Sequence, residues 1–267
     1  MTKICQTLFF LLILSNTTWA QTINTAYARA LQGRYRPQPT DFCASCKLWV
    51  NPYYRSIADT AEHRPLITYY VYTKAHRLAQ EALQLPRTGT YSKWFPAYGQ
   101  PKEDSAYTEA NRIVNQPDLP GEIQKGHCQA WILLAYTVDG AILSDTYTFN
   151  SAMEFRGQNL GTEIESEERC RALTGNDGHR AVADSVRIWC GTYGSQRTFT
   201  TGDVTNTVPT HYYKIIEYYD LVQHRRVEFC YWMPNQPGET RDKLDDRKKT
   251  YAELCALLHF RPKDIFQ

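Results

Sequence analysis

The chain has 267 residues, enough for one large domain or two small ones with a sizeable core. Its 42% hydrophobic and 22% charged content excludes collagen-like, coiled-coil and wholly disordered proteins. Lys3 is the only charged residue among positions 1–20, so from position 21 onward 29 basic residues face 28 acidic ones. A nearly neutral chain produces no global positive field, and any binding of nucleic acid therefore requires a local basic surface.

Residues 1–20 have the features of a secretory signal peptide. The basic Lys3 precedes the apolar run 8–14, and the small residue Ala20 ends the segment, which is the usual order of such peptides. A membrane anchor is the alternative, but crossing the hydrocarbon layer takes roughly 20 apolar residues, far more than this run contains. We expect cleavage after Ala20 and a secreted or periplasmic product with no membrane attachment.

Export would place the remaining seven cysteines in an oxidising compartment, where disulfides persist. Because seven is odd, at least one thiol stays free or pairs between chains, and the connectivity stays open. Cys43 and Cys46 suit a redox pair or half of a zinc site, but no second Cys or His pair completes a tetrahedral metal set. We expect a structural disulfide there, and Cys128 is a candidate for the odd thiol.

In chain order, the first expected segment after the signal is an irregular N-terminal layer over 21–63, rich in Pro, Gln, Tyr and Arg. The domain over 64–267 then opens with a β-branched and aromatic run at 66–72, which predicts a strand. A helix is predicted over 75–85, ended by Pro86. Residues 87–120 are rich in Pro, Gly, Asn and Asp and predict a long surface loop, a candidate wall of a substrate cleft.

The second half is more regular. The mixture of elements, without alternating βαβ units, predicts an α+β fold on a mostly antiparallel sheet. The predicted strands cover 130–136, 186–193, 211–220 and 226–233, and the predicted helices cover 159–173 and 250–259.

Two segments carry the candidate chemistry. Residues 124–127 read Gln-Lys-Gly-His, and a second segment starts with Asn150 and continues into a helix with Asn159, Glu167 and Arg171. Here the sequence resembles the DNA/RNA non-specific endonucleases of the ββα-metal nuclease superfamily. Their hallmark is Asp-Arg-Gly-His, followed by a strand end with Asn and a helix with Asn, Glu and Arg. The resemblance covers about residues 64–235 and implies a ββα-metal nuclease core with flanking helices.

Helix geometry supports the resemblance. At 100° per residue, Asn159 and Glu167 lie about 80° apart around the axis and Arg171 about 40° further, so all three share one face. An amide oxygen, a carboxylate and a guanidinium on one face suit a hard cation and a phosphate. Since Mg²⁺ prefers oxygen ligands and often takes only one or two from the protein, Asn159 is the predicted metal ligand, with Mg²⁺ or Mn²⁺ as cofactor.

The resemblance implies hydrolysis with a single metal ion. His127 would be the general base, the metal at Asn159 would contact the scissile phosphate, and Glu167 would order its waters. Lys125 and Arg171 would contact phosphate oxygens and Asn150 the substrate, with products carrying 5′-phosphate and 3′-hydroxyl ends. Nothing in this set reads a base edge, which predicts DNA and RNA as substrates with low sequence specificity.

The sequence also departs from the family pattern. Gln124 and Lys125 replace the family's Asp and Arg, which exchanges a bidentate fork for a point charge. Glu154 stands where the family usually has Gln, and Glu163 where it has Trp. The family's transition-state-stabilising arginine is not placed by spacing; Arg87 and Arg112 are the candidates.

Two hypotheses follow. The first is an exported, metal-dependent nuclease, and the second is a catalytically inactive secreted binding protein on the same fold, in which the departures reflect lost chemistry. Each residue alone has a simpler explanation, such as Asn159 as a helix N-cap, but their joint order and the retention of His127 and Asn159 favour the nuclease. The preference between DNA and RNA and the oligomeric state stay open.

Overall fold

A computed structural model describes residues 26–89, 93–114, 121–175 and 180–266. The predicted signal peptide therefore lies outside the described residues. Within these ranges, no helix combines the length and the apolar character that crossing a membrane requires.

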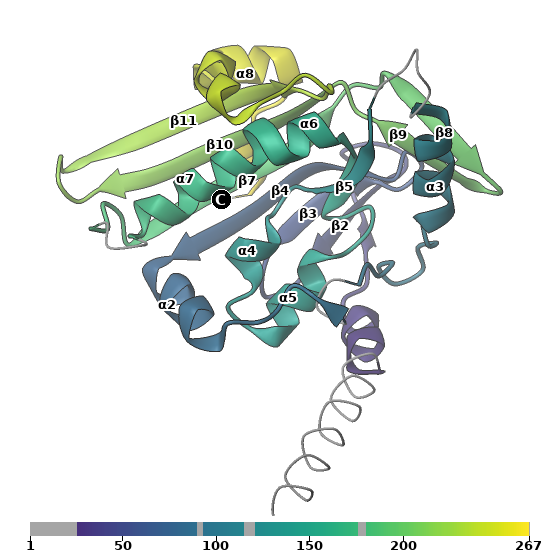
Figure 1. Ribbon diagram of the computed structural model, residues 1–267, viewed down its shortest axis with the longest axis horizontal. Coiled ribbons are helices and arrows are strands. Elements are labelled where there is room, and N and C mark those ends of the chain that lie inside the picture. The colour runs from purple at the N-terminus through teal and green to yellow at the C-terminus, as the bar shows by residue number, and fades with distance from the viewer. Residues whose placement is uncertain (1–25, 90–92, 115–120, 176–179, 267) are drawn as a thin grey trace, which may run out of the picture.

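An eight-stranded antiparallel sheet forms the centre of the molecule (Figure 1), with strand order β1-β2-β3-β4-β7-β10-β11-β12. Tyr, Ile and Val are frequent in the long strands, as expected of residues that suit a pleated, half-buried surface. The expected α+β fold is confirmed. The strands are β1 (Gln38–Pro39), β2 (Cys46–Val50), β3 (Arg55–Asp59), β4 (Arg64–Thr73), β7 (Ser185–Tyr193), β10 (His211–Asp220), β11 (Arg225–Pro234) and β12 (Lys248–Lys249).

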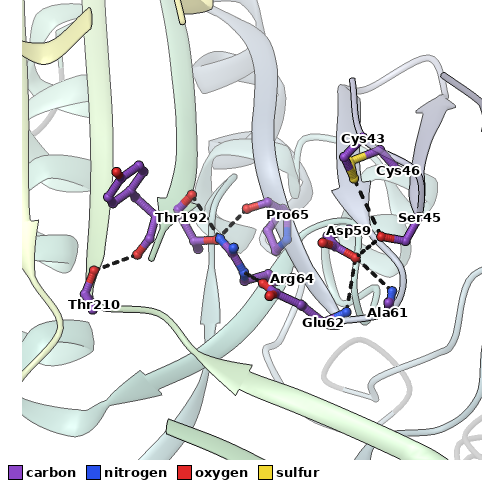
Figure 2. Close-up of polar contacts among 11 residues, drawn as sticks. Cys43, Ser45, Cys46, Asp59, Ala61, Glu62, Arg64, Pro65, Thr192 and Thr210 are labelled. Atoms are coloured by element: carbon purple, nitrogen blue, oxygen red, sulfur yellow. Dashed lines mark hydrogen bonds and ion pairs between the residues drawn. A yellow bond between two sulfur atoms is a disulfide. The ribbon is translucent and has the colours of Figure 1, made fainter. Parts of the chain in front are cut away.

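The segment expected to be an irregular N-terminal layer contains three of these strands. β3 pairs with β4, so the sheet continues across residue 63 without a break. Figure 2 shows how this region is fixed: Cys43 and Cys46 form a disulfide, and Ser45 Oγ donates to Asp59 Oδ1 at 2.7 Å. The same Asp59 oxygen accepts the backbone N–H of Ala61 at the turn into β4. The predicted structural disulfide is confirmed. The prediction of an irregular segment is wrong, because two five-residue strands are too short to show a detectable periodicity in the sequence.

Two further predictions are wrong. The expected strand at 130–136 is the short helix α4 (Trp131–Leu134), which is followed by α5 (Val138–Ser144). A short apolar run is compatible with a buried strand or a buried helix, and periodicity alone does not separate them. The expected loop over 87–120 contains α3 (Asp104–Val114), which buries Ala106, Ala110 and Val114 along one side.

The remaining elements flank the sheet. Two cores lie on its opposite faces: alternate residues of β7 place Ile188 and Cys190 in one core and Trp189 in the other. α6 and α7 cross the first face, as Figure 1 shows, while α8 supplies Leu254 and Leu258 to the second. These elements are α2 (Lys74–Leu83), β5 (Ile123–His127), β6 (Ser151–Phe155), α6 (Arg156–Gln158), the π-helical turn η2 (Asn159–Glu163), α7 (Ile164–Leu173), β8 (Arg197–Thr201), β9 (Val204–Val208), the 3-10 helix η3 (Arg241–Arg247), α8 (Tyr251–Leu258) and α9 (Pro262–Ile265).

Candidate active site

The candidate site is built on a β-hairpin and the helical segment that follows it. β5 pairs antiparallel with β6, with Gln124 opposite Glu154 and His127 opposite Ser151. Alternate residues of a strand point to opposite faces, and the contacts follow this rule. Gln124 meets Asn159 on the helix side, whereas Lys125 and His127 lie against the ring of Trp94 on the other side. Lys125 and His127 therefore share one side of β5, and Gln124 faces the other.

His127 is buried and held through one ring nitrogen. Its Nε2 lies 2.8 Å from Asp145 Oδ1, and its side chain keeps 7% exposure against 2% for Asp145. The ring of Trp94 packs on the imidazole with centroids 4.7 Å apart. Nδ1 has no hydrogen-bond partner in the described part of the chain. Burial lowers the pKa of His127; Asp145 opposes this shift, while Arg87 and Lys214 add to it. A neutral imidazole is the form that can accept a proton.

Lys125 lies beside His127 on the same face. Its Nζ is 2.6 Å from Asp104 Oδ1. The rings of Trp94, Tyr107 and Tyr147 surround it at 5.0 to 5.7 Å from their centroids, a distance at which aromatic faces stabilise a cation. Since Asp104 is exposed, a phosphate can compete with it for Lys125.

Asn159 opens the helical segment beside Gln124. Its Nδ2 donates to Gln124 Oε1 at 2.7 Å, and its amide oxygen has no hydrogen-bond partner among the described residues. The turn that follows is π-helical, and Gly161 within it has φ −97° and ψ −108°. The regular 100° per residue does not hold across such a turn, so the angle predicted between Asn159 and Glu167 is not preserved.

The two unusual acidic residues lie in one buried cluster. Glu163 forms an ion pair with Lys214 of β10, both side chains being 1% exposed, and Lys214 Nζ also donates to Ser166 Oγ at 2.9 Å. Burial by itself would lower the pKa of Lys214, but Glu163, together with Cys190 and Glu167, outweighs burial and raises it. The lysine therefore stays charged and supplies the partner for the glutamate that stands at the family's Trp position.

Glu154 is fully buried, and neither of its carboxyl oxygens has a hydrogen-bond partner in the described residues. Burial, with Glu163 and Glu167 acting in the same direction, raises its pKa well above the usual range. A Cβ at Gly126 would lie 1.9 Å from Oε2 of Glu154, so this close approach requires glycine before His127. A protonated carboxyl has nearly the shape of the amide in Gln, the residue that the family usually has here.

Glu167 and Arg171 follow along α7. Burial raises the pKa of Glu167 to about 7; Glu163 adds to the shift, and Lys214 and Arg87 oppose it. Arg171 lines a cavity of about 280 Å³ together with Trp131 of α4, and its Nε is buried without a partner among the described residues. No described hydrogen bond or ion pair joins Glu167 or Arg171 to His127.

The structure distinguishes the two candidate arginines. Arg87 is exposed, its guanidinium lies 5.6 Å from the centre of the Trp131 ring, and its charge affects both His127 and Glu167. Arg112 pairs with Glu109 at 2.6 Å on the exposed side of α3. Of the two, Arg87 is the one close to the predicted base.

Asn150 ties two segments together. Its Oδ1 accepts the backbone N–H of Gln129 at 2.7 Å, and its Nδ2 donates to the carbonyls of Gln129 and Ser144 at 2.8 and 2.7 Å. These bonds use both amide hydrogens and the side chain is fully buried, so the contacts support a positioning role beside His127.

Sequence reasoning missed Asp145 and Trp94. Asp145 had a usable signal, because a lone acidic residue in the apolar stretch 141–149 needs a buried partner. Trp94 lies in the segment expected to be a loop, and no feature of the sequence marks it as a site residue.

The donor set suits a hard cation. Among the described residues, no group of three or more His, Cys, Asp and Glu side chains could hold a metal ion. Asn159 nevertheless offers an amide oxygen that has no partner in the described part of the chain, near the cluster of Glu154, Glu163 and Glu167. A cation that keeps most of its waters and needs few protein ligands fits this arrangement.

Comparison with known proteins gives independent information. The profile of the DNA/RNA non-specific endonuclease family matches residues 39–260. A search of curated protein sequences finds no match. Among solved structures, the chain is similar to the crystal structure of the EndoG/EndoGI complex, which describes the mechanism of EndoG inhibition. The TM-score is 0.56 at 15% identity, covering 81% of this chain and 86% of that one.

Proposed function

Because the chain belongs to the DNA/RNA non-specific endonuclease family, we propose that it is an exported nuclease that cuts DNA and RNA with His127 as general base and one Mg²⁺ or Mn²⁺ at Asn159. Membership of this family makes the chain a nucleic-acid hydrolase. We propose the identity of the base, the metal and the export. The observation that carries it is the state of His127: its Nε2 is bound to Asp145, its pKa is lowered, and its Nδ1 has no partner among the described residues.

The reaction follows from these atoms. Nδ1 of His127 takes a proton from a water molecule, and the resulting hydroxide attacks the phosphorus. The bond from phosphorus to the 3′ oxygen breaks, and that oxygen takes a proton from solvent, which leaves a 5′-phosphate and a 3′-hydroxyl. A divalent cation at Asn159 would neutralise charge on the phosphate and on the leaving oxygen.

Three cations are available for the phosphates. Lys125 would exchange Asp104 for a phosphate oxygen, because its position among three aromatic rings fixes the ammonium while Asp104 stays exposed. Arg171 and Arg87 both lie near Trp131 and would extend the charge along the backbone of the substrate. We assign Asn150 to positioning.

Two features support export. Residues 1–20 have the composition of a signal peptide, and Cys43 and Cys46 form a disulfide, which is stable in oxidising compartments. We therefore propose a secreted or periplasmic enzyme.

The test is degradation of plasmid DNA and total RNA by residues 21–267 with Mg²⁺, with Mn²⁺ and with EDTA. We expect cleavage that requires a metal. His127→Ala should lose about a hundredfold or more, in line with the contribution of a general base, and Asn159→Ala should lose activity because it removes the proposed metal ligand. The control is His211→Ala, which removes a half-buried histidine that stacks on Trp232. Full activity of His127→Ala would refute the assigned base. A folded protein that cuts nothing with either metal would favour the inactive binding protein.

A further inference from the structure

The buried carboxylate of Asp145 is bound to a ring nitrogen of the predicted base. The side chain is 2% exposed, and its only side-chain hydrogen bond in the described residues is the one to His127. Burying a carboxylate is costly unless it is hydrogen-bonded. The buried carboxylate of Asp145 therefore needs the hydrogen bond to His127, and the same bond fixes the imidazole ring.

The surrounding backbone fixes this pair from both sides. Asn150 binds the backbone of Gln129, two residues after His127, and of Ser144, one residue before Asp145. One amide group thus sets the spacing between the strand that carries the imidazole and the turn that carries the carboxylate.

Trp94 packs on the imidazole of His127, and backbone hydrogen bonds tie its segment to the turn that carries Asp145. Phe95 N donates to the carbonyl of Asp145 at 2.9 Å, and Tyr147 N donates to the carbonyl of Phe95 at 3.0 Å. These bonds align the segment of Trp94 with the turn of Asp145 and hold the indole against the imidazole. The ring of His127 is left with little freedom to rotate.

We infer that Asp145 is the positioning residue of the general base, holding His127 with the ring proton on Nε2 so that Nδ1 presents its lone pair to the attacking water. This inference rests on the proposed function. A carboxylate accepts hydrogen bonds and does not donate them, and a neutral imidazole has a single N–H, so the contact at Nε2 selects the tautomer.

Asp145 also stabilises the positive charge that develops on His127 during the reaction. Proton transfer from water to Nδ1 creates an imidazolium in a buried site, with the carboxylate at 2.8 Å as its counterion. The other charged groups that affect His127, Arg87 and Lys214, both disfavour the imidazolium. Without Asp145 the base would be weaker, and its acid limb would move to lower pH.

The first test is the tautomer, measured without substrate or metal. In protein labelled with ¹⁵N-histidine, the resonances of His127 are assigned by their loss in His127→Gln. We expect a protonated Nε2 and an unprotonated Nδ1 in the wild type, and a mixture of tautomers in Asp145→Asn, whose amide can donate as well as accept. Asp139→Asn is the matched control, because it changes a carboxylate on α5 that binds Tyr27 instead. Protonated Nδ1 in the wild type would refute the inference.

The second test is single-turnover kinetics across pH. We expect Asp145→Asn to lower the maximal rate about tenfold or more, to change KM less than twofold, and to shift the acid limb to lower pH. In a His127→Ala background, Asp145→Asn should add nothing further. An equal loss in that background would mean a merely structural role, and an unchanged rate in Asp145→Asn would also overturn the inference. Full activity of His127→Ala would instead overturn the proposed function itself.

Discussion

Glu154 shows how one residue can depart from a family pattern without disturbing the site. Its carboxyl is buried without a hydrogen-bond partner among the described residues, and its pKa is raised from an ordinary 4.5. In the folded protein it is therefore held in the neutral form, which resembles the amide of Gln. The unfolded chain ionises the same group freely, so folding must retain a proton here at any pH between the unfolded and the folded pKa.

Glu154→Gln should stabilise the protein, and more so at higher pH. A carboxyl whose pKa is raised by folding costs nothing below its unfolded pKa, and its cost grows as pH rises toward its folded pKa. We expect a gain of about 1–3 kcal/mol in the free energy of unfolding at pH 8 and little change at pH 4, measured by urea denaturation. Glu168→Gln, an exposed change on α7, is the control. A loss of stability at pH 8 would show that the carboxylate is ionised and partnered.

If Lys125 binds a phosphate as proposed, Asp104 competes with the substrate for it, and Asp104→Asn tests this. Removing the carboxylate 2.6 Å from Nζ should free the ammonium and lower repulsion toward phosphate. We expect KM for DNA to fall several-fold at low salt with little change in kcat. Glu109→Gln, which removes a charge paired with Arg112 on the same helix, should not change KM. An increased KM in Asp104→Asn would mean that Asp104 orients the lysine for substrate.

At the scale of elements, the π-helical turn η2 is where the chain sets the position of Asn159. Gly161 packs directly on the backbone before η3: a Cβ there would lie 2.8 Å from the carbonyl oxygen of Glu239. The turn and the segment it touches therefore hold each other at a distance that only glycine allows.

Gly161→Ala should push these two segments apart. Overpacking of this kind costs about 1–3 kcal/mol, and since Asn159 belongs to the same turn, we expect weaker metal activation as well. Gly238→Ala is the matched control, because a Cβ there would contact nothing within 4 Å. Thermal unfolding and the Mg²⁺ concentration for half-maximal cleavage are the measurements. Equal behaviour of the two variants would contradict the packing argument.

The sequence predicted the long elements well and the short ones poorly. Strand 66–72 and helix 250–259 were recoverable because long, β-branched or capped segments carry strong local signals, and β4 and α8 match them. α4 was misassigned since four apolar residues, Trp131–Leu134, have no detectable period. The motif located His127 and Asn159, but not Asp145 or Lys214, whose roles depend on contacts across 18 and 51 positions of the chain.

The whole molecule carries almost no net charge once residues 1–20 are set aside. Binding to a polyanion must therefore come from the few cations at the site, which we take to be Lys125, Arg171 and Arg87. Each phosphate contact to duplex DNA contributes about −0.9 to the slope of log affinity against log salt.

We therefore expect a slope of about −3 for duplex DNA, reduced by about one in Lys125→Ala. The measurement is the salt dependence of KM, or of binding with a metal that does not support cleavage. Lys74→Ala, an exposed lysine at the start of α2, should leave the slope unchanged. A slope several times steeper would show a basic surface beyond these residues.

The order of strands in the central sheet has a consequence for when activity can arise. β4 pairs with β7 and β7 with β10, so the sheet is complete only after the last third of the chain is available. Lys214, which neutralises Glu163 beside the site, arrives on β10. A chain threaded outward from its N-terminus would stay inactive until most of it had left the cytoplasm. Under the proposed export, the place of β10 late in the chain would therefore delay nuclease activity until most of the chain had been exported.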